Sequence, residues 1–219
     1  MTQVAATVNQ EATAPTAGGS EYLLWLEYLN RSYFEWSQAA DWEVLRRLFV
    51  PTVTGVSQAT LSLPQDFRKL ASEVKLYSGD TEWGDSFGEI MWEEENNYSP
   101  HTRYVKTLGN MSEGFSLIFH PGTLASGASI VIQYYAMPTS LASPLSVPIT
   151  PDSQFLIDRT IAYIFESRSD SRFQLEENKA RERLLTMVEG ENDRKFNSYA
   201  GSAQVTTPER RAGFRIGRD

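Results

Sequence analysis

Two helical patterns follow each other between residues 150 and 192. Apolar residues recur at helical spacing in two stripes, the first made of Ile157, Ile161, Ile164 and Phe165 and the second of Phe173, Ala180, Leu184, Met187 and Val188. Thr150 and Pro151 suit the start of the first helix, and Gly190 is placed to end the second. Two such helices cannot bury both apolar faces against each other, so the pattern predicts a third.

The third helix is predicted from Glu21 to about Phe49, after a candidate cap at Ser20 and before Pro51. One face of this segment is apolar and includes Leu26, Tyr33, Ala40, Val44 and Leu48. Residues 1–19 are rich in Ala, Thr and Gly, so we expect them to form a disordered or extended arm.

After Pro51 the spacing of apolar residues changes from that of a helix to that of short strands. The β-type runs are Val53–Val56, Thr60–Leu63, Glu73–Tyr77, Gly88–Trp92, Tyr104–Leu108, Phe115–Phe119 and Ser129–Tyr135. A single helical turn is expected at Asp66–Ala71. The predicted fold class is α+β: a three-helix bundle formed by 20–49 and 150–192, with a small antiparallel β sandwich or barrel inserted at 50–140. Both termini are expected to be extended, with a C-terminal tail at 193–219.

Composition narrows the function classes. The 219 residues fit one domain or two small ones, and the lack of Cys excludes disulfides, thiolate metal sites and cysteine nucleophiles. No apolar run approaches the roughly 20 residues of a membrane span. The N-terminus also lacks the basic and apolar regions of a secretory signal. We therefore expect a protein made in the cytoplasm that has no membrane partner.

Charge is unevenly distributed within a net charge of −8. Asp80–Glu95 contains seven acids and no Lys or Arg. This run is either a solvated loop or a surface that repels DNA or meets a basic partner. The candidate residues for such a surface are Glu89, Glu93, Glu94 and Glu95.

The last twelve residues, PERRAGFRIGRD, have a net charge of +2. A tail of this kind is either disordered or orders on another protein, as an added strand or a charged anchor. The candidate interface residues are Arg210, Arg211, Phe214, Arg215, Ile216 and Arg218.

Motifs for catalysis are missing from the sequence. His101 and His120 are the only histidines, and neither has metal-ligand spacing; there is no GxSxG elbow, P-loop or GxGxxG after a strand. Trp83, Trp92 and Tyr98 could form a sugar-binding platform or pack within a β layer. We predict that the protein is not an enzyme and has no metal or cofactor.

The order of several segments resembles a known family. LNRSYFEWSQAADWEVLRRL is followed by LPQDFRKL, FSLIFHPGTLASGASIVIQYYAMP, SPLSVP and LLTMVEGEN. This order and spacing, over residues 20–192, resembles the head–tail connector (adaptor) proteins of tailed bacteriophages, particularly those with a β-domain inserted into a helical bundle.

The resemblance implies a structural role in the virion, at the head–tail interface. Such proteins form a ring, usually of twelve copies, under the portal protein, where they extend the DNA channel and present a docking surface for a stopper or tail protein. Their C-terminal tail often reaches into the portal ring, a role that residues 199–219 would take here. The alternative is a carbohydrate- or protein-binding virion module, such as a tail or baseplate component, that uses its β-domain.

Overall fold

The computed structural model describes residues 1–9, 13–54, 59–77, 85–90, 103–120, 124, 126–143 and 146–205. The chain divides into two units, Met1–Ala40 with Ser140–Asp219, and Asp41–Thr139. We call the first the helical unit, because all the long helices belong to it, and the second the β unit. In chain order the β unit is inserted into the helical unit.

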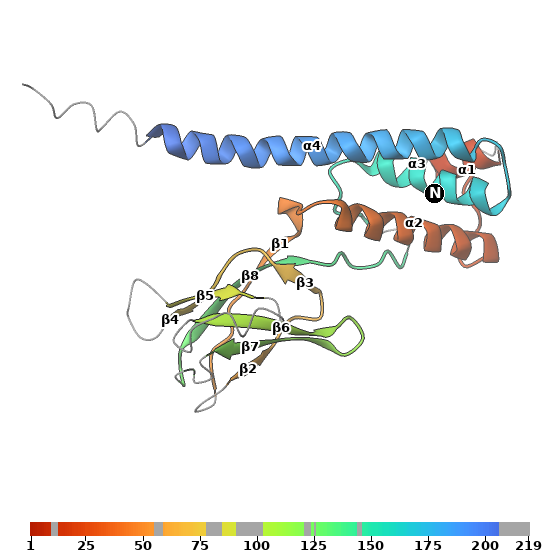
Figure 1. The fold of residues 1–219 in the computed structure, drawn as a ribbon. Helices are drawn as coiled ribbons and strands as arrows, with labels where there is room; N and C mark the ends of the chain where they lie inside the picture. Colours follow the sequence, from red (N-terminus) through yellow and green to blue (C-terminus); the bar gives the residue numbers. More distant parts are fainter. Residues whose placement is uncertain are drawn as a thin grey trace, which may run out of the picture. The chain divides into compact units, whose positions relative to one another are not determined.

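The predicted fold class is wrong in both of its parts. The described residues form four α-helices rather than three, and eight strands in one curled mixed sheet, a half-barrel, rather than a small antiparallel sandwich or barrel (Figure 1). The additional helix comes from the segment that was expected to be an N-terminal arm. The additional strands come from segments whose pattern was helical.

Helix α1 (Thr2–Val8) is stabilised by burial rather than by its own propensity. Val4, Ala5 and Val8 are buried in a cluster with Trp25, Ile161, Ile164 and Phe165. A helix of seven residues is not stable alone in water, so this tertiary contact is what keeps it folded. The Ala- and Thr-rich composition of the segment hid this apolar face.

Helix α2 (Ser20–Ala39) ends well before Phe49, the predicted end. A 3-10 turn follows at Glu43–Leu45, and strand β1 (Arg46–Phe49) pairs antiparallel with β8 (Ser129–Ala136). Val44 and Leu48, which the pattern placed on a buried helical face, are 48% and 62% exposed. Pairing with a distant strand therefore overrides the local helical pattern.

The predicted helical hairpin exists as α3 (Ser153–Ser167) and α4 (Phe173–Val205), but its ends differ. Asp152, not Thr150, caps α3, and its side chain accepts a hydrogen bond from the Gln154 backbone N–H at 2.8 Å. Gly190 does not end α4. A glycine inside a helix costs only about 1 kcal/mol relative to alanine, which the strong helix formers on both sides outweigh.

The β unit is one sheet with strand order β1-β8-β4-β5-β6-β7-β2, and β3 also pairs with β8. The remaining strands are β2 (Thr60–Ser62), β3 (Phe67–Leu70), β4 (Val74–Tyr77), β5 (Asp85–Glu89), β6 (Tyr104–Asn110) and β7 (Gly114–His120). β5 and β6 are parallel, whereas the other pairs are antiparallel. β3 forms where a helical turn was predicted.

The core of the β unit lies inside the curl of the sheet. On β8, Ile130, Ile132 and Tyr134 are buried, while Val131 and Gln133 between them are partly exposed. Burial thus alternates from Ser129 to Tyr134, whereas Tyr135 and Ala136 at the end of the strand are both buried. The partners of these residues in the core come from nearly every strand and include Leu61, Phe67, Val74, Leu76, Phe87, Val105, Leu117 and Phe119.

Candidate functional site

Few of the residues singled out by the sequence lie in the described part of the chain. Glu89, at the end of β5, is exposed and accepts a hydrogen bond from the Thr107 hydroxyl. Glu93, Glu94 and Glu95 lie outside the described residues. So do the tail candidates Arg210, Arg211, Phe214, Arg215, Ile216 and Arg218.

The residues considered for metal or sugar binding also lie mostly outside the described part of the chain. His120, on β7, stacks its ring on Tyr104 with centroids 4.5 Å apart. His101, Trp83, Trp92 and Tyr98 lie outside the described residues. Among the residues that the structure describes, no group of three or more His, Asp or Glu side chains is placed to hold a metal ion. No helix in the same part of the chain is long and apolar enough to cross a membrane.

The structure brings together a cluster of charged and aromatic residues that the sequence did not indicate. Its centre is Tyr163 on α3, and we call it the Tyr163 cluster: Arg31 and Glu35 from α2, Arg159 and Tyr163 from α3, and Glu177 from α4. Glu35 Oε2 accepts hydrogen bonds from Arg159 Nε and from the Tyr163 hydroxyl, each at 2.8 Å. The Arg159 guanidinium also pairs with Glu177.

Two guanidinium groups lie over the Tyr163 ring. The Cζ atoms of Arg31 and Arg159 are 4.3 and 4.4 Å from its centroid. Such contacts are attractive because the face of an aromatic ring carries partial negative charge. The cluster therefore joins α2 to α3 through the Tyr163 ring and the Glu35 carboxylate, and α3 to α4 through the Glu177 carboxylate.

The environment of the cluster shifts two pKa values. Burial, together with the hydrogen bond to Glu35, raises the pKa of the Tyr163 hydroxyl. Burial of the Arg159 guanidinium opposes its charge, but the hydrogen bond and charge of Glu35 outweigh this and raise its pKa. Both shifts favour a neutral Tyr163 and a charged Arg159, which are the protonation states that donate hydrogen bonds to Glu35.

A groove of about 580 Å³ opens beside the cluster. It is lined by Glu27, Asn30, Arg31, Phe34, Glu35, Gln38 and Tyr163. Both signs of charge are present, and Glu35 is already engaged by Arg159 and Tyr163.

A second charged cluster fixes the start of α3 to the first third of α4. Arg183 donates from Nε to Asp158 and from an Nη atom to Asp152, both at 3.1 Å. Asp158 is only 7% exposed and also accepts from Gln154 Nε2 at 2.7 Å. These bonds locate Arg183 beside the first turns of α3, so α4 continues for some 22 residues, or roughly 33 Å, beyond that point.

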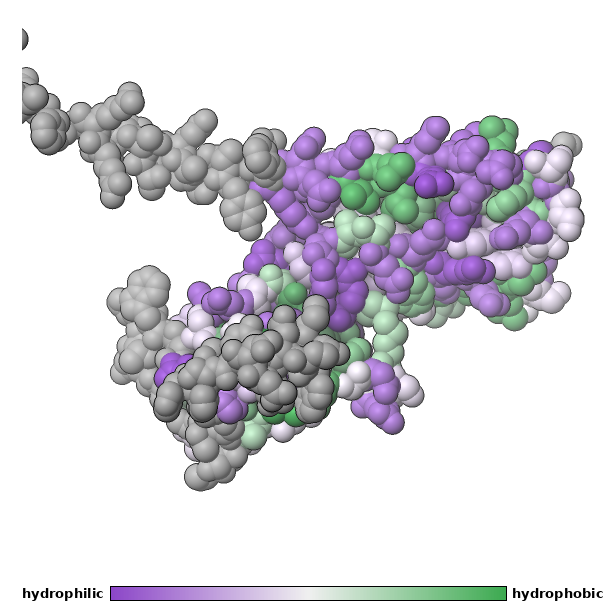
Figure 2. All heavy atoms as spheres, viewed as in Figure 1, coloured by the Kyte–Doolittle hydropathy of each residue, from purple (hydrophilic) through white to green (hydrophobic). Residues whose placement is uncertain are grey.

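The surface of α4 is largely polar. Where α4 is coloured in Figure 2, most of its side chains in that view are hydrophilic, with a smaller hydrophobic area among them. In the stretch from Phe173 to Lys195, whose side chains are described, the exposed large apolar residues are Leu175 and Leu185, at 57% and 54% exposed. A polar helix that extends beyond its neighbours is suited to reach another molecule.

Comparison with known proteins gives no family. No protein-family model matches the chain, and no curated protein matches it.

Proposed function

We propose that the protein is a virion structural protein, a head-to-tail adaptor. In this proposal it forms a dodecameric ring that docks under the portal protein and extends the DNA channel. The ring presents the attachment surface for a stopper or tail protein. The resemblance in segment order supports this proposal, and so does the insertion of the β unit into a helical unit formed from both ends of the chain.

The observation that carries the proposal is the length of α4. Its 33 residues correspond to roughly 50 Å, whereas the 15 residues of α3 correspond to roughly 22 Å. In the sequence, the basic segment that contains Arg210, Arg211 and Arg215 follows directly after this helix. A helix that extends beyond its own bundle and is followed by a charged, partly apolar segment is suited to dock on a separate ring.

The test is electron microscopy of the protein mixed with the portal protein of the same virion. We expect rings of twelve copies attached to the portal, and we expect deletion of Pro208–Asp219 to abolish or strongly reduce attachment. The deletion lies beyond the end of α4 at Val205, so the cooperative thermal transition should be retained. A full-length protein that stays monomeric with the portal would overturn the proposal.

A second candidate is a carbohydrate- or protein-binding virion module. It is favoured by a groove of about 410 Å³ on the outer face of β4 and β8, lined by Ser72, Glu73, Lys75, Tyr77, Val131 and Gln133. Polar side chains beside an aromatic ring are suited to sugar or peptide binding. Tyr77→Ala should then abolish binding in a glycan-array or pull-down assay without affecting attachment to the portal.

A further inference from the structure

Helix α1 is held in the helical unit by one apolar face. Val4, Ala5 and Val8 on this face are 1%, 0% and 6% exposed, and they pack on a surface formed by α2 and α3. We call this surface the α1 groove, and it consists of Trp25, Ile161, Ile164 and Phe165. Burial in the groove is the main contribution to the docking of α1, because burial of apolar surface is favourable in proportion to its area.

The ends of α1 add little to its stability. No side chain among the described residues caps its N-terminus, and it has no acid in its first turn and no base in its last turn. At the C-terminal end, Asn9 donates to Glu21 at 3.2 Å and accepts from Arg168 at 2.9 Å, both at exposed positions. A helix of seven residues does not form alone in water. Helix α1 is therefore folded only while it occupies a groove.

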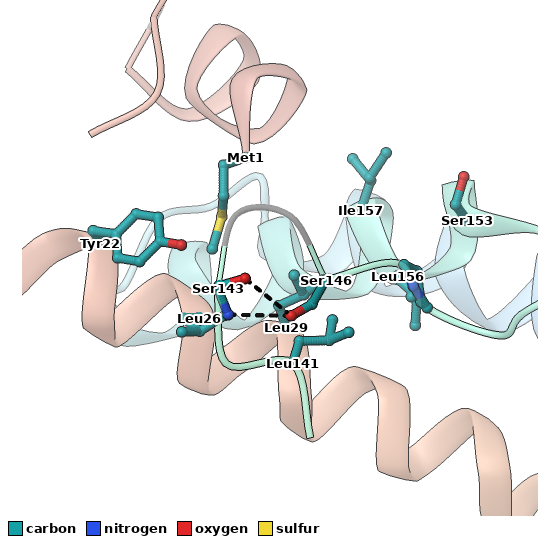
Figure 3. A pocket seen from close by; sticks show the side chains of 11 residues that line it. Met1, Tyr22, Leu26, Leu29, Leu141, Ser143, Ser146, Ser153, Leu156 and Ile157 are labelled. Carbon is teal, nitrogen blue, oxygen red and sulfur yellow. Dashed lines mark hydrogen bonds between the residues drawn. The ribbon is translucent and has the colours of Figure 1, made fainter. Parts of the chain in front are cut away.

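Packing is loose at the N-terminal end of α1. Met1 lies there beside a small apolar pocket, and Tyr22, Leu26 and Leu29 of α2 contribute to the walls of the same pocket (Figure 3). The pocket has a volume of about 190 Å³. Side chains that line a space forgo the van der Waals contacts that direct packing would give. Met1 therefore strengthens the docking of α1 less than the three buried residues do.

A turn at Thr16–Gly19 precedes α2. The Gly19 backbone N–H donates to the Thr16 carbonyl oxygen at 3.0 Å, and Gly18 has φ of 84°, a conformation that favours glycine. Ten residues separate Asn9 from Ser20, where α2 begins. Ten extended residues span at most roughly 33–36 Å. If the turn opens, the chain is therefore long enough for α1 to reach the groove of a neighbouring copy.

We propose that in the assembled ring α1 leaves its own groove and docks in the α1 groove of the next copy. The structure already shows that α1 fits this groove, and the exchanged helix would make the same apolar contacts and the same Asn9 hydrogen bonds. Exchange of an identical element between copies is a low-cost route to association. The two forms differ mainly in the turn at Thr16–Gly19 and in the cost of bringing two copies together.

A ring gives this exchange a direction. Each copy gives its α1 to the next copy and receives one from the previous copy, which is a heterologous contact that closes when the rotation between copies allows it. Neighbouring copies held side by side have an effective concentration that is roughly millimolar, so exchange is favoured in the ring and not in dilute solution. This inference rests on the proposed ring assembly, and it names a contact that would lock neighbouring copies together.

The absence of cysteine from the chain allows a direct test. In an Asn9→Cys/Glu21→Cys protein, a short bis-maleimide joins the end of α1 to the start of whichever α2 it lies against, because the native side chains are within 3.2 Å. A dilute protein should give an intramolecular product. Rings assembled on the portal protein, and the protein alone at high concentration, should give a series of covalently joined oligomers on a denaturing gel.

The matched control for chance collisions is Asn9→Cys/Leu185→Cys, in which the second cysteine is exposed on α4. This control should give few joined oligomers under the same conditions. Both cysteine substitutions at the α1 contact remove the same bonds from the exchanged and the unexchanged form, so they leave the balance between the two forms nearly unchanged. An equal yield of oligomers from the control would overturn the inference.

Intramolecular product alone, both with the portal protein and at high concentration, would also overturn the inference. If the protein attaches to the portal and gives only intramolecular product, the exchange is wrong and the proposed function stands. If joined oligomers form but no attachment to the portal is seen, the exchange stands and the proposed function fails.

Two glycines separate the role of the turn from a general loss of stability. Gly18 and Gly127 both have φ of 84°, and a Cβ added at either would have nothing within 4 Å. In the double-cysteine protein, Gly18→Ala should raise the ratio of intermolecular to intramolecular product about tenfold, because alanine disfavours the turn that only the unexchanged form needs. Gly127→Ala carries the same backbone strain in the β unit and should leave the ratio unchanged. Equal ratios in the two variants would contradict the exchange.

Discussion

Charged side chains cross between the helices of the helical unit, whereas the corresponding layer of the β unit is apolar. In the helical unit, Glu35 and Arg159 connect α2 to α3, and Arg183 connects α4 to two aspartates at the start of α3. The β unit instead buries a continuous cluster of aliphatic and aromatic residues inside the curled sheet, and its ion pairs, such as Arg47–Asp66 and Arg68–Asp41, lie outside that cluster.

The difference shows how each unit specifies its own geometry. A hydrogen bond between charged groups has a preferred direction, so it sets how far one helix slides along another. A sheet is already aligned by its ladders, and its core needs only shape and volume. Substitutions should therefore act differently in the two units, and four experiments test this.

The largest effect is expected in the core of the β unit. Phe119 is 2% exposed and meets the Phe87 ring edge-on, with centroids 5.4 Å apart. Phe119→Ala should cost about 3–5 kcal/mol of unfolding free energy, because it removes a buried ring and leaves a cavity. Leu108→Ala, at an exposed position of β6, is the control and should cost far less.

Native-state hydrogen exchange shows where the loss occurs. Amide protection should fall in β5–β8 and stay nearly constant in α3. An equal loss of protection in α3 would show that the two units unfold as one, and the comparison drawn above would no longer hold.

A smaller effect is expected in the Tyr163 cluster. Glu35→Gln removes the charge that pairs with Arg159, whose side chain is 15% exposed. Breaking a fully buried ion pair costs about 3–5 kcal/mol. Because the Glu35 side chain is 36% exposed, we expect about 1–2 kcal/mol. Urea denaturation measures this loss of unfolding free energy, and Glu27→Gln on the same helix is the control. If both variants lose the same unfolding free energy, the cluster has no role in stability.

The same substitution of glycine by alanine should have opposite signs in the two units. Gly190 lies inside α4, and a Cβ added there would have nothing within 4 Å, so Gly190→Ala should stabilise by about 0.5–1 kcal/mol. Gly109→Ala should destabilise, because its φ is positive and its Cβ would meet backbone. Thermal melts measure both variants. Melting temperatures that shift in the same direction would contradict this pair of predictions.

One residue in each unit should respond to an opposite extreme of pH. Hydrogen bonds from Arg172 lower the pKa of Asp170, between α3 and α4, to about 2. Since the folded-state pKa lies below the ordinary value of 3.8, this carboxylate stabilises the fold above pH 3.8, and the contribution is lost as pH falls through about 2. Asp170→Asn should flatten this acid dependence in urea denaturation.

In the β unit, burial and the hydrogen bond to Asp66 raise the pKa of Tyr134 to about 12. The folded-state pKa lies above the ordinary value of 10, so the contribution is complete below pH 10 and is lost as pH rises through about 12. Tyr134→Phe should flatten the alkaline dependence. Unfolding curves of either variant with the pH dependence of the wild type would contradict the assignment.

The local sequence pattern was sufficient to predict an element where the spacing of its apolar residues agreed with their burial. Ile157, Ile161 and Ile164 predicted α3, and the alternation around Ile132 predicted β8. Val44 and Leu48 misled because their spacing of four fits both a helical face and alternate positions of a strand. Only β8, more than 80 residues later, makes the segment a strand. The buried face of α1 likewise depends on Ile161 and Phe165, which no local pattern could reveal.

The interaction surfaces were less predictable than the elements. Glu35 and Tyr163 are 128 residues apart in the chain, and no spacing rule connects them. The small apolar pocket beside Tyr22 depends on Leu141 and Leu156 closing against α2, which no local pattern predicts. The roles of the acidic run and the C-terminal tail stay predictions.

The insertion also determines an order of events during synthesis. Asn30 on α2 exchanges two hydrogen bonds with the backbone of Leu141, 111 residues later, and the Tyr33 hydroxyl accepts from the Ile149 backbone N–H. At roughly 5–20 residues per second, a ribosome makes the intervening chain in about 6–22 s. During that time the β unit can finish folding, while Trp25 still lacks its partners on α3 and Tyr33 lacks the Ile149 backbone. Slow translation of the β unit would therefore expose α2, rather than the sheet, to chaperones and to aggregation.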